Sequence, residues 1–152
     1  MRIYRIHPAS RNAADFGGSL IVAGRWNPAG TAMLYCSTAL SLACLEILVH
    51  MNADEIPPGC AFSTGELAAT PDIADFRGRL LDDDATRRYG HTWALSQRSM
   101  AILVPSVVIP IEFNVLLNPT HSGFGEVQWS APKVFGFDRR LFLKFPEHPA
   151  DE

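Results

Sequence analysis

Arg25 lies in a turn-forming segment whose residue types suit the binding of a charged ligand. The segment reads GRWNPAG, and its glycines and proline allow the backbone to turn tightly and to approach a ligand closely. A guanidinium in such a turn can bind two phosphate oxygens as a fork. An arginine that stacks on Trp26 or pairs with a surface acid fits the same sequence. Trp26 itself is expected in the core, and Asn27 is explained by turn chemistry.

Glu46 is the residue that simple packing explains least well. It stands among apolar residues in the run STALSLACLEILVHM. Such a carboxylate either lies on a narrow exposed stripe beside His50 or faces a cavity. In a cavity, its charge would act on a cation or on positive charge that develops during a reaction. Tyr35, at the end of the preceding apolar run, could share that cavity and stack on a planar heterocycle, or could be a core tyrosine with a bonded hydroxyl.

Two more polar side chains, Arg5 and Ser106, interrupt apolar runs. Arg5 stands in RIYRI and is either a charge on an exposed strand edge or a charge that faces a ligand. Ser106 stands in VPSVVIP, where it either marks a bend or offers a hydroxyl to a ribose or an amide. Asn114, Asn118 and His121 look mostly like turn formers.

The sequence holds no established motif for metal, nucleotide or hydrolase chemistry. The patterns GxGxxG, GxxxxGK[ST], HExxH and GxSxG are absent. Cys36, Cys44 and Cys60 fit neither the spacing of a zinc knuckle nor a disulfide framework. We therefore expect buried free thiols and no bound metal or cofactor.

These residues must be positioned by a mixture of helices and short strands. The run from residue 37 to 51 predicts the best helix of the chain, capped by its first Ser or Thr and central because it is apolar nearly all round. A weaker helix is expected over residues 84–98, where Gly90 interrupts it. Proline, asparagine and glycine separate the β-like runs, which favours hairpins and an α+β class. The expected strands lie at residues 2–6, 31–37, 60–67, 101–110, 113–119, 126–132 and 140–145.

Length and charge point to one domain that binds neither nucleic acid nor membrane. A chain of 152 residues can bury one core, and no linker appears before the tail over residues 146–152. The net charge of −3, with scattered Lys and Arg, provides no basic surface for a duplex. No apolar run is long enough to span a membrane, and the first residues do not resemble a signal peptide. We expect a cytoplasmic protein.

Several motifs, in order, resemble those of the RES-domain family. They are GRWNPAG, then LYCS running into SLACLEILVH, then VPSVVIPIEFNVLLNPTH followed by FDRRLF, and together they cover nearly the whole chain. Members of this family are toxins of bacterial toxin–antitoxin pairs that consume NAD. The resemblance implies a single RES domain over residues 1–145 with an ADP-ribosyltransferase-like α+β fold, in which mainly antiparallel strands accompany a central buried helix and few others. It also implies an Xre-like helix-turn-helix antitoxin as partner.

The resemblance further assigns roles to the polar residues singled out above. It implies that Arg25, together with Arg5, holds the diphosphate of NAD and that Tyr35 stacks near the nicotinamide. Glu46 would face the nicotinamide ribose, and Ser106 would form a hydrogen bond at the same end. Glu46, Arg25 and Tyr35 are the expected catalytic residues, and NAD is a substrate rather than a cofactor.

The acceptor of the ADP-ribose is left open by the sequence. Water or phosphate as acceptor would make the protein an NAD-degrading toxin, which is the leading hypothesis. A protein acceptor would make it a mono-ADP-ribosyltransferase. A binding module that has this fold but no turnover is the third possibility.

Overall fold

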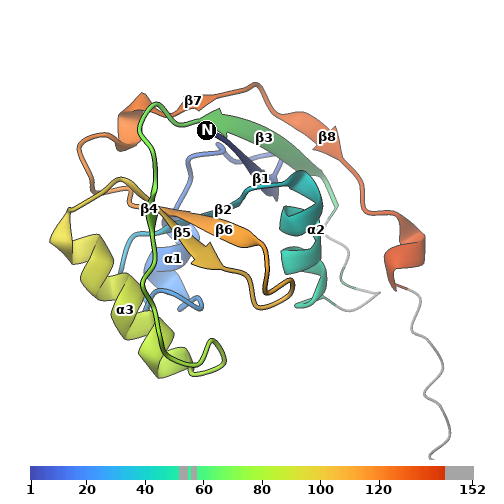
Figure 1. The fold of residues 1–152 in the computed structure, drawn as a ribbon. Coiled ribbons are helices and arrows are strands. Elements are labelled where there is room, and N and C mark those ends of the chain that lie inside the picture. Colours follow the sequence, from blue (N-terminus) through green and yellow to red (C-terminus); the bar gives the residue numbers. More distant parts are fainter. Residues whose placement is uncertain (52–54, 56–57, 143–152) are drawn as a thin grey trace, which may run out of the picture.

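The computed structural model describes residues 1–51, 55 and 58–142, and its centre is one curled sheet (Figure 1). The described strands are β1 (Arg2–Pro8), β2 (Leu34–Ser37), β3 (Cys60–Glu66), β4 (Asp72–Ile73), β5 (Ala101–Pro105), β6 (Phe113–Leu117), β7 (Gln128–Trp129) and β8 (Lys133–Phe135). Their order in the sheet is β4-β5-β6-β2-β1-β3-β7, and β8 pairs with β3. The β4–β5 pair is parallel and the others are antiparallel. The predicted α+β class is confirmed.

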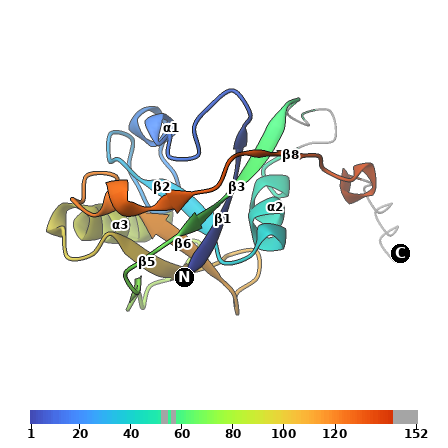
Figure 2. The same cartoon turned by 90° about the horizontal axis from the view of Figure 1, so that it is seen from above.

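Helices flank this sheet at separate places along the chain. They are α1 (Gly17–Ile21), α2 (Leu40–Leu48), α3 (Asp83–Ser96) and the 3-10 helices η2 (Phe124–Glu126) and η3 (Arg139–Phe142). Helix α2 packs beside β1 and β2, and α3 packs against β5 and β6 through Trp93 and Ala94 (Figures 1 and 2). Both long helices were predicted, whereas the five-residue α1 lies where the sequence indicated no helix.

Helix α2 begins differently from the prediction. Its N-cap is Ala39, which offers no side chain to the first turn, so the expected Ser or Thr cap is wrong. The preceding hydroxyls bond to β6 instead, because Thr38 Oγ1 donates to the carbonyl of Phe113 and Ser37 Oγ donates to the side chain of Asn114. The helix packs beside β1 and β2, but only two of its side chains, Leu42 and Ala43, are fully buried. One side of this apolar helix therefore remains accessible.

Strand alternation decides which side chains reach the same face of the sheet. Ser37 in β2 is paired with Asn114 in β6, and Tyr35 with Leu116, so these residues share one face. The intervening residues, among them Cys36, pack in the core cluster on the other face. The first face also carries Trp26, Met33, Tyr35, Trp93, Ile102, Val104 and Leu116, which form or border a second cluster.

Gly90, the residue that weakened the helix prediction, has a steric role in α3. A Cβ built on Gly90 would lie 1.8 Å from the carbonyl oxygen of Trp26. The close approach fixes α3 against the turn that contains Trp26, whose side chain is 2% exposed and lies in the core as expected. Glycine lowers the helix propensity at this position, but a larger residue would prevent the contact with Trp26.

One expected strand is wrong in the part that the structure describes. The run over residues 140–145 was expected to be extended, but its described residues belong to η3. Asp138 explains the difference, because its carboxylate accepts from the backbone N–H of Arg140 and its carbonyl accepts from that of Leu141. These local bonds use donors that a sheet would need.

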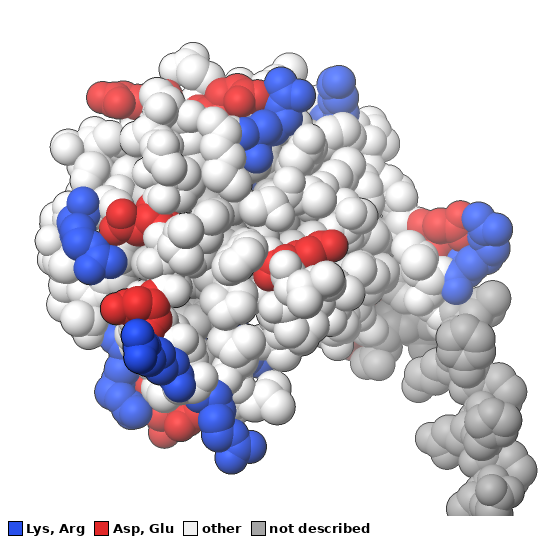
Figure 3. Space-filling view, viewed as in Figure 1, with Lys and Arg blue, Asp and Glu red and all other residues white. Residues whose placement is uncertain are grey.

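Cysteine side chains are mostly inside the protein, and charged side chains lie on its surface. Cys36 and Cys60 are buried as predicted, Cys44 is half-buried, and none of the three forms a disulfide within the described residues. On the face in Figure 3, blue and red side chains lie together in small mixed groups near the edge, and much of the centre is uncharged. None of the described helices has the length and apolar character that a membrane crossing requires.

Candidate functional site

Three adjoining cavities meet at Tyr35 and form what we call the Tyr35 cleft. A cavity of about 230 Å³ is lined by Arg5, Tyr35, Glu46 and Asn114, among others. A second, of about 350 Å³, continues past Arg5 toward Gly24 and α1. The third, of about 310 Å³, is lined by Arg25, Tyr35 and Glu46. Four of the five predicted site residues therefore line one cleft, which α2 borders through Glu46.

Glu46 is held by two donors that both reach the same carboxylate oxygen. Ser106 Oγ donates to Glu46 Oε1 at 2.7 Å, and Asn114 Nδ2 donates to the same atom at 2.5 Å. Within the described part of the chain, Oε2 accepts no hydrogen bond. The carboxylate is half-buried and lines two of the three cavities. The arrangement fits a carboxylate aimed into a cavity better than an exposed helix glutamate.

Ser106 sits behind Glu46 rather than on the wall of the cleft. It is 0% exposed, and its Oγ also accepts from the backbone N–H groups of Val108 and Ile109. With two donors pointing at its oxygen, the hydroxyl proton is directed to Glu46. The sequence placed Ser106 in direct contact with the ligand, and that contact stays a prediction. In the structure, its hydrogen bond is to the carboxylate.

Tyr35 uses its hydroxyl to shape the turn that carries Arg25. Tyr35 Oη accepts from the backbone N–H of Trp26 at 3.0 Å and donates to Asn27 Oδ1 at 2.7 Å. Burial raises the pKa of Tyr35 to about 12, so the phenol is neutral near pH 7. A Cβ on Gly24 would lie 2.5 Å from Tyr35 Oη, which explains the glycine at that position. The ring, rather than the hydroxyl, is the part of Tyr35 left for a ligand.

Arg25 lines the cleft while one end of its guanidinium is anchored. Nη1 donates to the carbonyl of Leu80 at 2.5 Å and to Asp83 Oδ1 at 2.9 Å. The pair with Asp83 is partly exposed, with side-chain exposures of 28% and 51%, so water screens it. Among the described residues, Nε and Nη2 make no hydrogen bond. The anchored guanidinium therefore keeps free N–H groups for an anion.

Arg5 lies in β1, where the pairing of Tyr4 with Ser37 puts it on the face of Cys36, and it still lines two of the three cavities of the Tyr35 cleft. Its Nη2 donates to the carbonyl of Asp15 at 2.8 Å, and its Nη1 donates to the carbonyl of Ala13. Burial lowers the pKa of the Arg5 guanidinium from its usual value, although it stays protonated near neutral pH. Arg5 is thus a fixed positive charge between two of the cavities rather than an exposed edge charge.

Two asparagines that were interpreted mainly as turn formers, Asn27 and Asn114, also bond to residues that line the Tyr35 cleft. Asn114 lies within β6 and bonds to Glu46 and Ser37. Asn27 is 0% exposed, and its Oδ1 accepts from Tyr35 and from the backbone N–H of Gly24. The expected strand over residues 113–119 already contained Asn114, but nothing in the sequence indicated its contact with Glu46.

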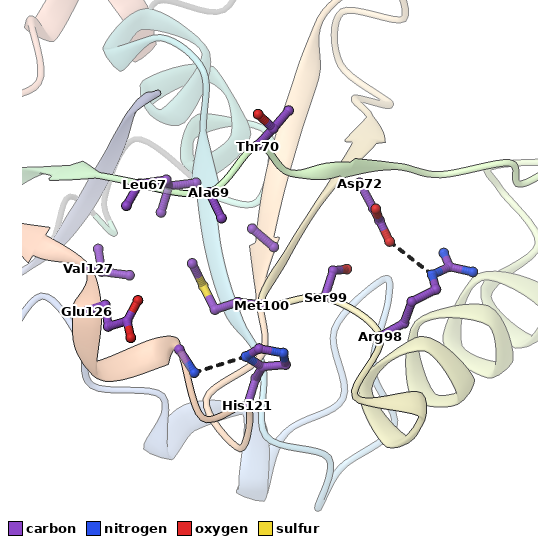
Figure 4. Close-up of a pocket in the computed structure, with 13 residues that line it drawn as sticks. Leu67, Ala69, Thr70, Asp72, Arg98, Ser99, Met100, His121, Glu126 and Val127 are labelled. Carbon is purple, nitrogen blue, oxygen red and sulfur yellow. Dashed lines mark hydrogen bonds and ion pairs between the residues drawn. The ribbon is translucent and has the colours of Figure 1, made fainter.

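A separate cavity of about 340 Å³ shares no lining residue with the Tyr35 cleft (Figure 4). At its rim, Arg98 Nε donates to Asp72 Oδ2 at 2.9 Å. His121 Nδ1 accepts from the backbone N–H of Gly123. Much of the remaining wall is apolar, with Met100 at its centre in Figure 4. None of the predicted site residues lies there.

The Tyr35 cleft combines groups that can bind an anion with a group that can stabilise positive charge. Arg5 and Arg25 supply cations, Tyr35 a ring, and Glu46 an oriented carboxylate. The described residues contain no group of three or more His, Cys, Asp or Glu side chains suited to a metal ion. The chemistry that these side chains offer is electrostatic.

Comparisons with known proteins agree with the fold and motifs. The RES domain family model matches residues 2–136. A "Prs ADP-ribosylating toxin" of Sphingobium sp. is 32% identical over 142 residues, covering 84% of this chain and 85% of that protein. A "Toxin Res" of Yersinia enterocolitica is 34% identical over 157 aligned residues, covering 93% of this chain and 99% of that protein.

A solved structure shares the fold at low sequence identity. The chain resembles one in the M. tuberculosis MbcT-MbcA toxin–antitoxin complex with a TM-score of 0.67 and 16% identity. The match covers 93% of this chain and 86% of the other. Together with the family model and the relatives, it agrees with the fold expected from the motifs. The chain belongs to the RES domain family.

Proposed function

We propose that this protein is the toxin of a toxin–antitoxin pair and that it cleaves NAD at the bond between nicotinamide and ribose. Hydrolysis or phosphorolysis of NAD would deplete the cellular pool. The observation that carries the proposal is Glu46, whose carboxylate is fixed through one oxygen and lines the same cleft as two arginines and a tyrosine. Relatives named as toxins support the toxin role.

The position of Glu46 suits the charge that this reaction creates. Loss of nicotinamide leaves positive charge on the ribose in an oxocarbenium-like transition state. A carboxylate already held in place stabilises that charge without having to reorganise, and so acts more on the transition state than on the ground state. Since Ser106 and Asn114 both occupy Oε1, Oε2 is the oxygen that would face the ribose.

The arginines and Tyr35 suit the rest of the substrate. The free N–H groups of Arg25 can take two diphosphate oxygens while its Nη1 stays bonded to Leu80 and Asp83. Arg5 adds a second fixed cation. The ring of Tyr35 lines one cavity with Arg5 and Glu46 and another with Arg25 and Glu46, so nicotinamide could stack on it there. In this account, Glu46, Arg25 and Tyr35 are the catalytic residues.

A mono-ADP-ribosyltransferase is the second candidate, and one comparison favours it. The relative from Sphingobium sp. is named for ADP-ribosylation of Prs. Transfer to a protein would break the same bond and would use the same Glu46, so the cleft is compatible with either acceptor. A binding module without turnover is a third reading, and it requires that Glu46 be chemically idle.

An antitoxin partner is part of the proposal. The matched solved structure is a toxin–antitoxin complex, which supports a protein partner for this chain as well. We propose that the partner is an Xre-like helix-turn-helix protein, as the motif resemblance implies. DNA contacts would then belong to the partner, since this chain carries a net charge of −3.

Labelled NAD separates these candidates. Purified protein is incubated with NAD labelled in the adenylate half, with and without phosphate and with and without a bacterial lysate. Free nicotinamide accompanied only by small labelled products supports degradation of NAD. Label that appears on a protein band only when lysate is present supports the transferase. Intact NAD in every reaction, with protein shown to be folded, would contradict both.

A further inference from the structure

Asn114 stands at the middle of a hydrogen-bonded chain that ends on the reactive carboxylate. Ser37 Oγ donates to Asn114 Oδ1 at 2.7 Å, and Asn114 Nδ2 donates to Glu46 Oε1 at 2.5 Å. The three residues come from β2, β6 and α2, which are joined at this point by the paired positions Ser37 and Asn114. The chain therefore connects the helix that carries Glu46 to the rigid centre of the sheet.

The direction of each hydrogen bond in this chain is determined. An ionised carboxylate can only accept, so Asn114 must present its NH₂ group to Glu46. Its carbonyl oxygen then points to Ser37, whose hydroxyl can donate. Ser37 is 3% exposed, so water does not compete for that bond. Without Ser37, the amide could rotate and place its oxygen against the carboxylate of Glu46.

We propose that Asn114, oriented by Ser37, is a positioning residue that sets the direction of the Glu46 carboxylate in the cleft. The proposal rests on the proposed function of the Tyr35 cleft, because it assigns Asn114 a part in turnover. Ser106 fixes the same oxygen from a second strand end, so Glu46 Oε1 is held from two directions. Asn114 acts through Glu46 and contributes to the rate rather than to the affinity for substrate.

The expected consequence is a loss of kcat with little change in KM. In Asn114→Ala, Glu46 keeps one donor and gains rotational freedom, and a small displacement of a reacting group costs about 10-fold to 100-fold in rate. Ser37→Ala acts through the same amide and should lower kcat less. In the double variant, the loss of Ser37 should add nothing to the loss of Asn114, whereas independent effects would multiply.

Asn114→Asp provides a readout that a purely structural role would not produce. The side chain keeps its size and still accepts from Ser37, but when ionised it repels Glu46. At lower pH, the introduced carboxyl group and that of Glu46 share one proton, which restores a hydrogen-bond donor to Glu46. The ratio of variant to wild-type kcat should therefore rise as the pH falls from about 8.5 to about 5.5. Gln128→Glu, on the exposed β7, adds the same charge away from the cleft and is the control.

Taking the ratio removes the influence of other titratable groups that surround Glu46. They act equally on the wild type and on the variant unless the substitution moves them. Those that line the same cavities lie in β1, in β2, in the turn after α1 and directly after α2: Tyr4, Arg5, Tyr35, Cys36, Arg25 and His50.

A second measurement tests the positioning of Glu46 in the absence of NAD. Three-bond scalar couplings across χ1 of Glu46, measured by NMR, report how far the side chain is confined to one rotamer. We expect one rotamer in the wild type and averaged couplings in Asn114→Ala and, less strongly, in Ser37→Ala. If the wild type leaves NAD intact, the proposed function fails while these couplings still test the positioning.

Three results would overturn the inference, provided that thermal midpoints show folded variants. The first is an Asn114→Ala variant with unchanged kcat or with a loss confined to KM. The second is multiplicative loss in the double variant together with a flat pH ratio for Asn114→Asp. The third is an equally confined Glu46 rotamer with and without Asn114.

Discussion

Replacing Glu46 by glutamine removes one negative charge from the cleft and leaves the local hydrogen bonds intact. Both neighbours of Oε1, Ser106 Oγ and Asn114 Nδ2, are donors. The glutamine must therefore turn its amide oxygen toward them and its NH₂ group toward the cleft. A partial positive charge would then face the ribose where a full negative charge stood before. The structure thus predicts the orientation of the replacement as well as its charge.

The size of the effect follows from that geometry. Two unit charges about 4 Å apart interact by about 4 kcal/mol at the effective dielectric constant of about 20 typical near a protein surface. Loss of one oriented electrostatic contact in other active sites costs about 100-fold to 1000-fold in kcat. We therefore expect Glu46→Gln to lower turnover of NAD at least about 100-fold, with NAD affinity little changed. The free energy of unfolding should hold or rise, because a half-buried charge is removed.

Three measurements on Glu46→Gln test this reasoning together. Nicotinamide release gives turnover, calorimetric titration gives NAD affinity, and thermal unfolding gives stability. In cells, the variant should be expressed without its antitoxin, whereas the wild type should arrest growth. Near-normal turnover in a folded variant would refute the role of Glu46. It would also refute the proposal that a carboxylate in the cleft stabilises the positive charge on the ribose.

Three further predictions concern the turn, the helix and the phenol. Arg25→Ala should weaken NAD binding by about 10-fold to 100-fold, because a forked charge-assisted contact is lost, with the free energy of unfolding changed by less than about 1 kcal/mol; calorimetric titration and urea unfolding measure the two. Gly90→Ala should lower the free energy of unfolding by about 1–3 kcal/mol in urea, because its Cβ would overlap the carbonyl of Trp26. Tyr35→Phe should remove part of the alkaline loss of stability: burial raises the pKa of Tyr35 to about 12, so between about pH 10 and that value the unfolded state binds fewer protons and wild-type unfolding becomes easier.

Matched variants serve as controls for these three. Asp83→Asn keeps the Arg25 cation while removing its partner, so NAD affinity should hold or improve, and a loss equal to that of Arg25→Ala would count against a phosphate contact. Gly125→Ala meets nothing within 4 Å and should change stability by less than about 0.5 kcal/mol. For the phenol, burial also raises the pKa of Cys36 to about 12, so only the difference between wild type and Tyr35→Phe is diagnostic. Equal alkaline slopes in the two proteins would contradict the assignment to Tyr35.

Local patterns were enough to predict the elements that form the frame of the cleft. β-Branched and aromatic runs identified β1, β3 and β6, and the unbroken run of helix formers identified α2. Its N-cap was missed because hydroxyls at residues 37 and 38 bond to β6, a partner far along the chain. Propensity cannot report such a long-range competitor. The two-residue β4 and the local turn at Asp138 are below the length at which periodicity carries information.

The sequence was enough to single out several residues of the candidate site, but it did not predict the contacts that they make. Arg25, Tyr35 and Glu46 were singled out because packing explains them poorly, and the structure brings them to one cleft. Asn114 was missed because its role depends on the register between β2 and β6, which pairs it with Ser37. Ser106 was expected to touch the ligand, but a hydroxyl that follows a buried strand is equally suited to hold a carboxylate. The roles of these residues toward NAD remain predictions.

The account depends most directly on whether the purified protein breaks the bond between nicotinamide and ribose. A proton NMR time course of NAD with catalytic amounts of protein, with and without phosphate, follows both substrate and products. We expect NAD to disappear completely, with one nicotinamide released for each NAD and with Glu46→Gln almost inactive under the same conditions. NAD that stays intact in the presence of folded wild-type protein, or that is lost equally fast with Glu46→Gln, would contradict the account.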